Sequence, residues 1–134
     1  KYAKEVRSLI INERLESKIF IIGEVNYQYI PYIYQNSKFI IYASKSENCP
    51  NILLESMAAS KAIICSSNEP MPEFGKDSVL YFKPNNINDM AEKILLLLQD
   101  SNLIKKLETS AFNSSRFYDW KLTTQKTIEQ MKEI

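Results

Sequence analysis

Four short, mainly apolar runs constrain the fold of this chain more than any other feature. They occupy residues 18–22, 39–43, 62–65 and 79–82, and β-branched and aromatic residues are frequent in them. Runs of this length without polar alternation are typical of strands that are buried on both faces of a sheet. Helical patterns separate the runs, which predicts an α/β fold: a parallel sheet flanked by helices on both faces.

Segments before, between and after these runs repeat apolar residues at helical spacing. The first pattern extends from near the start of the chain to Leu15, and the second is capped by Asn26. The third places Pro50 at its first position, which suits the missing N–H of proline, and the fourth is capped by Asn88. The predicted helices cover approximately residues 6–15, 27–35, 51–59, 90–98, 101–112 and 121–132, with a short turn at 73–74.

The predicted topology places three loops at one edge of the sheet. Ligands of open parallel sheets bind beyond the carboxyl ends of the strands. The residues that follow the first three runs are Gly23, the segment 44–51 and the segment 66–73. We therefore expect a functional site at this edge.

Glu55 is the exception in the predicted helix 51–59. The other residues make this helix apolar nearly all round, so we expect it to be buried. A buried carboxylate needs hydrogen bonds, an ionic partner or a cavity. Short neighbours such as Ala58 and Ala59 leave room for a ligand, and a carboxylate accepts hydrogen bonds from a vicinal diol such as a ribose.

Glu47 lies in the loop just before the same helix. The free N–H groups of a helix N-terminus favour anions such as a diphosphate. A diol acceptor, an anion-binding helix end and a second carboxylate together suit a nucleotide-diphosphate sugar. Each residue also has an ordinary interpretation: Glu55 pairs with a basic residue in the core, and Glu47 is a solvated loop residue. Spacing alone favours the ordinary interpretations.

Composition narrows the function classes. The net charge of +1 gives no long-range electrostatic attraction for nucleic acid. The sequence has no histidine, so it lacks the commonest general base. The cysteines, Cys49 and Cys65, have no metal-ligand spacing, so we expect no metal site and a reduced, intracellular protein. Cys49 has no histidine to activate it as a nucleophile. No run approaches the roughly 20 apolar residues that cross a bilayer.

The stretch from Ser44 to Ala58 contains Glu47 and Glu55 in the pattern E-x7-E. It resembles the signature of retaining GT-B glycosyltransferases of the group 1, family 4 type. The resemblance covers nearly the whole chain in order, and its other matching segments are 21–25, 62–66, 71–75, 79–84 and the aromatic-x-Trp of 118–120. It implies that the Rossmann-like parallel sheet is a partial C-terminal domain of a GT-B glycosyltransferase.

The resemblance also implies roles for residues. Glu47 contacts the donor sugar near its reacting carbon and stabilises the transition state, whereas Glu55 binds the ribose hydroxyls. Main-chain groups of Cys49, Asn51 and Ile52 approach the sugar and the diphosphate. Gly23 and Val25 lie near the base. The substrate is then a nucleotide-diphosphate sugar, and the family generally needs no metal.

The resemblance further implies what lies outside residues 1–134, which we interpret as a single partial nucleotide-sugar-binding domain. The first βα elements, which carry the arginine and lysine that bind the diphosphate, and the N-terminal acceptor domain are not in this sequence. The expected acceptor is a glycan or a lipid-linked oligosaccharide, as in bacterial capsule or surface polysaccharide biosynthesis. We expect the full-length enzyme to be cytoplasmic, with peripheral association at the inner face of the plasma membrane as a second location. We expect residues 1–134 alone to be inactive.

Two positions depart from the family pattern. Pro50 stands where glycine is frequent and supplies no N–H, although Asn51 and Ile52 still can. Ser60 replaces a helix-ending glycine; in a left-handed conformation it costs roughly 1 kcal/mol.

Two other hypotheses remain open at this point: a non-catalytic binding module of the same fold, and a GT-B sugar-nucleotide epimerase, against which the E-x7-E pattern argues. The four tyrosines between Tyr27 and Tyr34 could form a stacking surface, but we interpret them as the core side and rim of a short helix.

Overall fold

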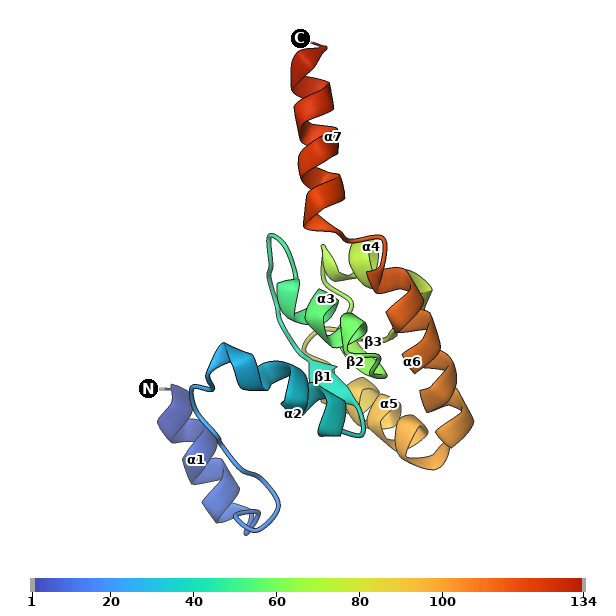
Figure 1. Cartoon of the computed structure of the whole chain (residues 1–134). Coiled ribbons are helices and arrows are strands. Elements are labelled where there is room, and N and C mark those ends of the chain that lie inside the picture. The colour runs from blue at the N-terminus through green and yellow to red at the C-terminus, as the bar shows by residue number, and fades with distance from the viewer. Residues whose placement is uncertain (1, 134) are drawn as a thin grey trace.

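The computed structural model describes residues 2–133 and places a parallel sheet at the centre of the molecule. Its strands are β1 (Ile40–Tyr42), β2 (Ile63–Ser66) and β3 (Leu80–Phe82), in the order β1-β2-β3 (Figure 1). Ile41 of β1 pairs with Ile64 of β2, and Ile64 pairs with Leu80 of β3. The predicted parallel α/β architecture is confirmed.

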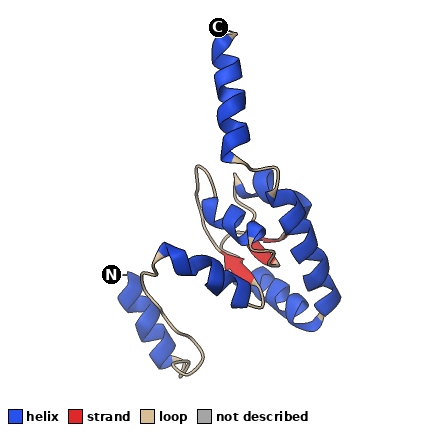
Figure 2. Ribbon diagram, in the orientation of Figure 1, coloured by secondary structure: helices blue, strands red, loops and turns tan. Residues whose placement is uncertain are grey.

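Helices account for most of the remaining described residues (Figure 2). Their bounds are α1 (Tyr2–Asn12), α2 (Ile30–Asn36), α3 (Asn51–Ala58), α4 (Met71–Gly75), α5 (Ile87–Gln99), α6 (Ser101–Ser115) and α7 (Trp120–Lys132), with 3₁₀ turns at Tyr27–Tyr29 and Lys76–Ser78. Within residues 2–133, no helix combines the length and the apolar character that crossing a membrane requires.

The core lies on both faces of β2, whose four residues are all buried. On one face, Ile63 packs in a cluster with Leu53 and Met57 of α3. On the other face, Ile64 packs in a cluster with Leu97 of α5, to which α6 also contributes. Alternate residues of a strand point to opposite faces, so a continuous apolar run serves both clusters. This is the two-sided burial that the sequence predicts.

The prediction of a strand at residues 18–22 is wrong. This segment has no regular secondary structure, and the side chain of Phe20 is 75% exposed while that of Ile22 is 66% exposed. A strand requires a neighbour to accept and donate its main-chain hydrogen bonds. Among the described residues, the pairing partners of the sheet are β1, β2 and β3 alone. The sheet therefore has three strands where the sequence predicts four.

Two helix starts also differ from the prediction. Helix α5 is capped by Asn86, whose side chain accepts a hydrogen bond from the Asp89 N–H at 3.1 Å, so Asn88 lies within the helix. Pro50 is the residue before α3 and not its first residue. Both differences are one or two positions, the usual uncertainty of helix ends. Ser60 does adopt the left-handed conformation, with φ of 57°.

The molecule has a compact body and two extensions (Figure 1). We call residues 37–118 the body, because they contain the sheet and the helices that cover it. We call residues 2–26 the arm; it comprises α1 and the following loop, and it lies to one side of the body. Helix α7 projects away from the body at the C-terminal end of the chain.

Candidate functional site

Glu47 lies in the loop after β1, and two hydroxyl groups donate to the same oxygen of its carboxylate. The Tyr42 hydroxyl, at the end of β1, is 2.5 Å from Oε1 of Glu47. The Ser44 hydroxyl is 2.6 Å from the same Oε1. Glu47 as a residue is half-buried, so it is neither a freely solvated loop residue nor a core residue.

These bonds set the charge state of the site. Hydrogen bonds from Ser44 and from Tyr42 lower the pKa of Glu47 below its ordinary value, because they stabilise the ionised form. Burial, together with the bond to Glu47, raises the pKa of Tyr42 to about 12. Near neutral pH the site therefore has an ionised carboxylate beside a neutral hydroxyl donor.

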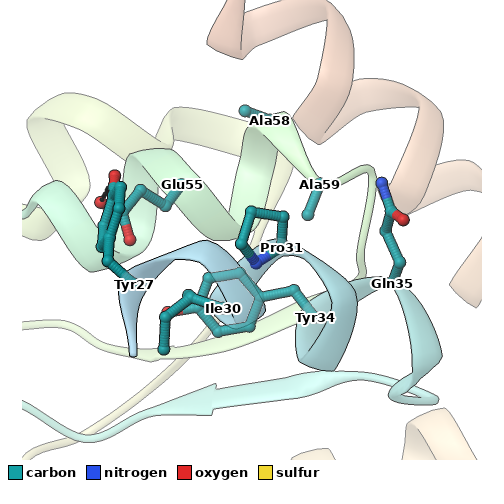
Figure 3. A pocket seen from close by; sticks show the side chains of 8 residues that line it. All are labelled: Tyr27, Ile30, Pro31, Tyr34, Gln35, Glu55, Ala58 and Ala59. Atoms are coloured by element: carbon teal, nitrogen blue, oxygen red, sulfur yellow. Dashed lines mark hydrogen bonds between the residues drawn. The ribbon is translucent and has the colours of Figure 1, made fainter. Parts of the chain in front are cut away.

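Glu55 projects from α3 towards a cavity of about 230 Å³. The hydroxyl of Tyr27 donates to Oε1 of Glu55 at 2.9 Å, and this bond is the main cause that raises the pKa of Tyr27 (Figure 3). The remaining lining residues are Ile30, Pro31, Tyr34, Gln35, Ala58 and Ala59. Ala58 and Ala59, at the end of α3, line the same cavity as Glu55 (Figure 3).

Two expectations about this region are wrong. Helix α3 is not buried all round, because Ile52 is 48% exposed and Ala58 is also exposed. The four tyrosines also do not form the core side of a helix, since Tyr27 is 70% exposed and Tyr32 is 68% exposed; Tyr34 is half-buried, so only the expected position at the rim agrees with the structure. Side chains of α3 and the strands fill the core without them. The ion pairs of residues 2–133 do not include Glu55, so a core salt bridge does not explain it.

The start of α3 supplies fewer free main-chain donors than the sequence predicts. The N–H of Asn51 donates to the carbonyl of Cys49 at 2.9 Å, and Pro50 between them has φ of −80° and ψ of 68°. This is an inverse γ-turn. The Asn51 N–H is therefore already hydrogen-bonded within this turn. The first main-chain N–H of the helix that the turn does not use is that of Ile52.

Two of the three predicted loops come together at the carboxyl edge of the sheet. The side-chain amide of Asn68 donates to the carbonyl of Lys45 at 2.9 Å, which joins the loop before α3 to the loop after β2. Gly23 has φ of 69°, and a Cβ added to it would meet no atom within 4 Å. No hydrogen bond among residues 2–133 joins Gly23 or Val25 to these loops.

Within residues 2–133, no three histidine, cysteine, aspartate or glutamate side chains gather into a group that could hold a metal ion. Both cysteines are free; Cys49 is exposed beside the start of α3 and Cys65 is buried in β2. The Sγ atom of Cys49 lies 3.5 Å from Oδ1 of Asn51.

Sequence reasoning did not identify the hydroxyl partners of the two glutamates. Tyr42 and Ser44 are two residues apart near the end of a strand, a spacing that directs side chains to one side. That local signal, three and five residues before Glu47, could have indicated them. Tyr27 is 28 residues from Glu55, so no local pattern connects the two.

Residues 1–114 match the protein family described as "Glycosyl transferases group 1". "O-antigen chain mannosyltransferase B" of Escherichia coli is 26% identical over 117 residues, which are 87% of this chain and 31% of that relative. "N-acetylgalactosamine-N,N'-diacetylbacillosaminyl-diphospho-undecaprenol 4-alpha-N-acetylgalactosaminyltransferase" of Campylobacter jejuni is 30% identical over 119 residues, 86% of this chain and 32% of the relative.

The fold matches that of Anabaena HepE, solved in complex with UDP, with a TM-score of 0.91 and 18% identity. The match covers 99% of this chain and 37% of HepE. The chain spans about a third of the length of these relatives. Because the family match extends from residue 1 to residue 114 and includes both glutamates, the chain belongs to the glycosyl transferases group 1 family.

Proposed function

We propose that this chain is the donor-binding part of a retaining glycosyltransferase. The full-length protein would transfer a sugar from a nucleotide-diphosphate sugar to a glycan or lipid-linked acceptor in polysaccharide biosynthesis. The observation that carries the proposal is the pair Glu47 and Glu55 on either side of the start of α3, each with one carboxylate oxygen bound to a tyrosine hydroxyl. The names of the bacterial relatives and the UDP bound to HepE support this substrate class.

In this proposal Glu47 acts at the reacting carbon of the donor sugar. The bond between that carbon and the diphosphate breaks while the acceptor oxygen forms a new bond to the same carbon, with retention of configuration, and the proton of the acceptor hydroxyl passes to the departing diphosphate. Positive charge develops on the sugar during this step, and an ionised carboxylate held nearby stabilises it. The lowered pKa of Glu47 favours this role, because the carboxylate stays charged.

Glu55 binds the ribose hydroxyls in the same proposal. Its cavity has tyrosine and aliphatic walls, with Glu55 as the acidic group among the lining residues. Ile52 and Cys49 approach the sugar and diphosphate, and Gly23 and Val25 lie near the base. Binding needs no protein-bound metal. The diphosphate-binding basic residues and the acceptor domain belong to the rest of the full-length protein, so this chain alone is expected to be inactive. The full-length protein would be cytoplasmic and would act at the inner face of the plasma membrane.

Kinetics of sugar transfer by the full-length protein test the two roles separately. Glu47→Gln should lower kcat by about 10²- to 10³-fold with little change in the donor KM, as for the loss of a group that stabilises the transition state. Glu55→Gln should raise the donor KM by about tenfold or more, because it removes charged hydrogen bonds to the ribose. Glu92→Gln is the control, since Glu92 is an exposed glutamate of α5.

Wild-type kinetics in both site variants would sink the proposed site. Nucleotide-sugar binding that depends on Glu55 without any transfer by the full-length protein would instead favour the non-catalytic binding module. NMR titration of this chain with UDP, GDP and ADP sugars would then identify the nucleotide. Weak binding is expected in that titration, because the basic residues that bind the diphosphate lie outside this chain.

A further inference from the structure

The hydroxyls of Tyr42 and Ser44 converge on one oxygen of Glu47. Both donate to Oε1, at 2.5 and 2.6 Å. No other hydrogen bond of residues 2–133 reaches this carboxylate, so Oε2 is left unengaged. The Ser44 hydroxyl also lies 3.4 Å from the carbonyl of Ser46, but the much shorter contact to Glu47 takes its single proton. The arrangement distinguishes the two oxygens of one carboxylate.

Tyr42 is a fixed donor. Its side chain is 8% exposed and belongs to the core cluster with Leu53 and Met57. Its main chain pairs with Cys65 of β2. A tyrosine ring held by strand pairing and core packing points its hydroxyl in one direction, whereas the glutamate side chain rotates about several bonds. The two hydrogen bonds therefore restrict the rotation of the Glu47 side chain and fix the orientation of its carboxylate.

We propose that Tyr42 and Ser44 are positioning residues that hold Oε1 of Glu47 and leave Oε2 directed at the donor sugar. This inference rests on the proposed role of Glu47 in sugar transfer and deepens it. Neither hydroxyl contacts the donor; each acts through Glu47. The bonds also keep the carboxylate ionised, in agreement with its lowered pKa. A supporting shell of this kind reduces the misorientation of a reacting group.

The variants Tyr42→Phe and Ser44→Ala each remove one donor and little volume. In the full-length protein we expect each to lower kcat by about tenfold and the pair by more, with the donor KM within about twofold of wild type. Ser44→Thr keeps a hydroxyl and should restore most of kcat. A residue that only stabilises the fold would not give a kcat loss with an unchanged KM, nor this rescue.

Matched controls come from neighbouring positions. Tyr81→Phe alters another tyrosine packed against the same core cluster, whose hydroxyl lies 3.4 Å from the carbonyl of Met71. Ser46→Ala alters an exposed serine of the same loop. Neither should change kcat by more than about twofold, the scatter that we allow for surface and distant changes. Thermal unfolding of all variants identifies any that lose kcat by unfolding.

A second readout is independent of catalysis. NMR titration of the Glu47 carboxyl carbon in this chain should show a pKa below the ordinary glutamate value of about 4.3, and Tyr42→Phe and Ser44→Ala should each raise it. Unchanged titration would overturn the inference. So would normal kcat in both hydroxyl variants when Glu47→Gln is impaired, which leaves the proposed function standing. If Glu47→Gln itself retains normal kcat, the proposed function fails, and the inference fails with it.

Discussion

The body and the arm each contain a short apolar run of similar composition, and the two runs adopt different structures. Residues 39–43 and 18–22 are both short apolar runs that read as buried strands. In the body, the first of these provides β1, which pairs with β2 and lies under α3. In the arm, the second is an exposed loop, because none of the described strands pairs with it. An apolar run is therefore a strand only where a neighbour completes its main-chain hydrogen bonds.

The largest expected effect comes from a pair of substitutions to alanine, one in the body and one in the arm. Leu53 in α3 is fully buried, so Leu53→Ala should lower the free energy of unfolding by about 2–5 kcal/mol through lost burial and a residual cavity. Phe20 is 75% exposed in the arm, and Phe20→Ala should change it by no more than about 0.5 kcal/mol. Urea unfolding followed by circular dichroism measures both. A loss above about 1 kcal/mol for Phe20→Ala would show that the arm is part of the cooperative body.

A second pair uses the two glycines of the chain. A Cβ at Gly75 would lie 2.5 Å from the hydroxyl of Tyr81 and 2.9 Å from Val79, so Gly75→Ala should cost about 1–3 kcal/mol. A Cβ at position 23 would meet no atom within 4 Å, so the only strain in Gly23→Ala comes from the left-handed φ of this residue, which lies in the arm. We expect the free energy of unfolding of the body to change by less than about 0.5 kcal/mol. Equal losses for the two variants would contradict the separation of the arm from the body.

The body was predictable because its signals are local and mutually consistent. Runs without polar residues predicted β1, β2 and β3, and helical spacing of apolar residues predicted α3 between them and α5 and α6 after them. The arm was not predictable to the same degree, since whether residues 18–22 pair depends on a neighbour and not on their own composition. Helix caps such as Asn86 were missed by two positions, because Asn88 offers the same chemistry one half-turn later.

The candidate site divides in the same way. Glu47 and Glu55 were identifiable from their places before and within one helix. The engaged N–H of Asn51 was not, because the turn at Pro50 depends on dihedral angles that several residues determine together. The partner of Glu55 was also hidden, since Tyr27 comes from the segment that follows the arm and meets α3 only in the folded chain.

The smallest expected effect concerns this bond, which connects the segment after the arm to the body. Tyr27 is 70% exposed, so water competes for its hydroxyl. Tyr27→Phe should therefore leave the free energy of unfolding almost unchanged. It should nevertheless loosen the turn at residues 26–29, where the Tyr29 N–H donates to the carbonyl of Asn26 at 2.9 Å.

Hydrogen exchange of the Tyr29 amide measures that loosening, because exchange reports local opening that global unfolding does not register. Tyr29→Phe is the matched control: Tyr29 lies in the same turn, is 56% exposed, and its hydroxyl has no hydrogen bond among residues 2–133. We expect faster exchange at position 29 in Tyr27→Phe and unchanged exchange in the control. Equal exchange in both variants would mean that the bond to Glu55 does not fix the turn, and that packing of α2 beside α3 holds this segment on the body instead.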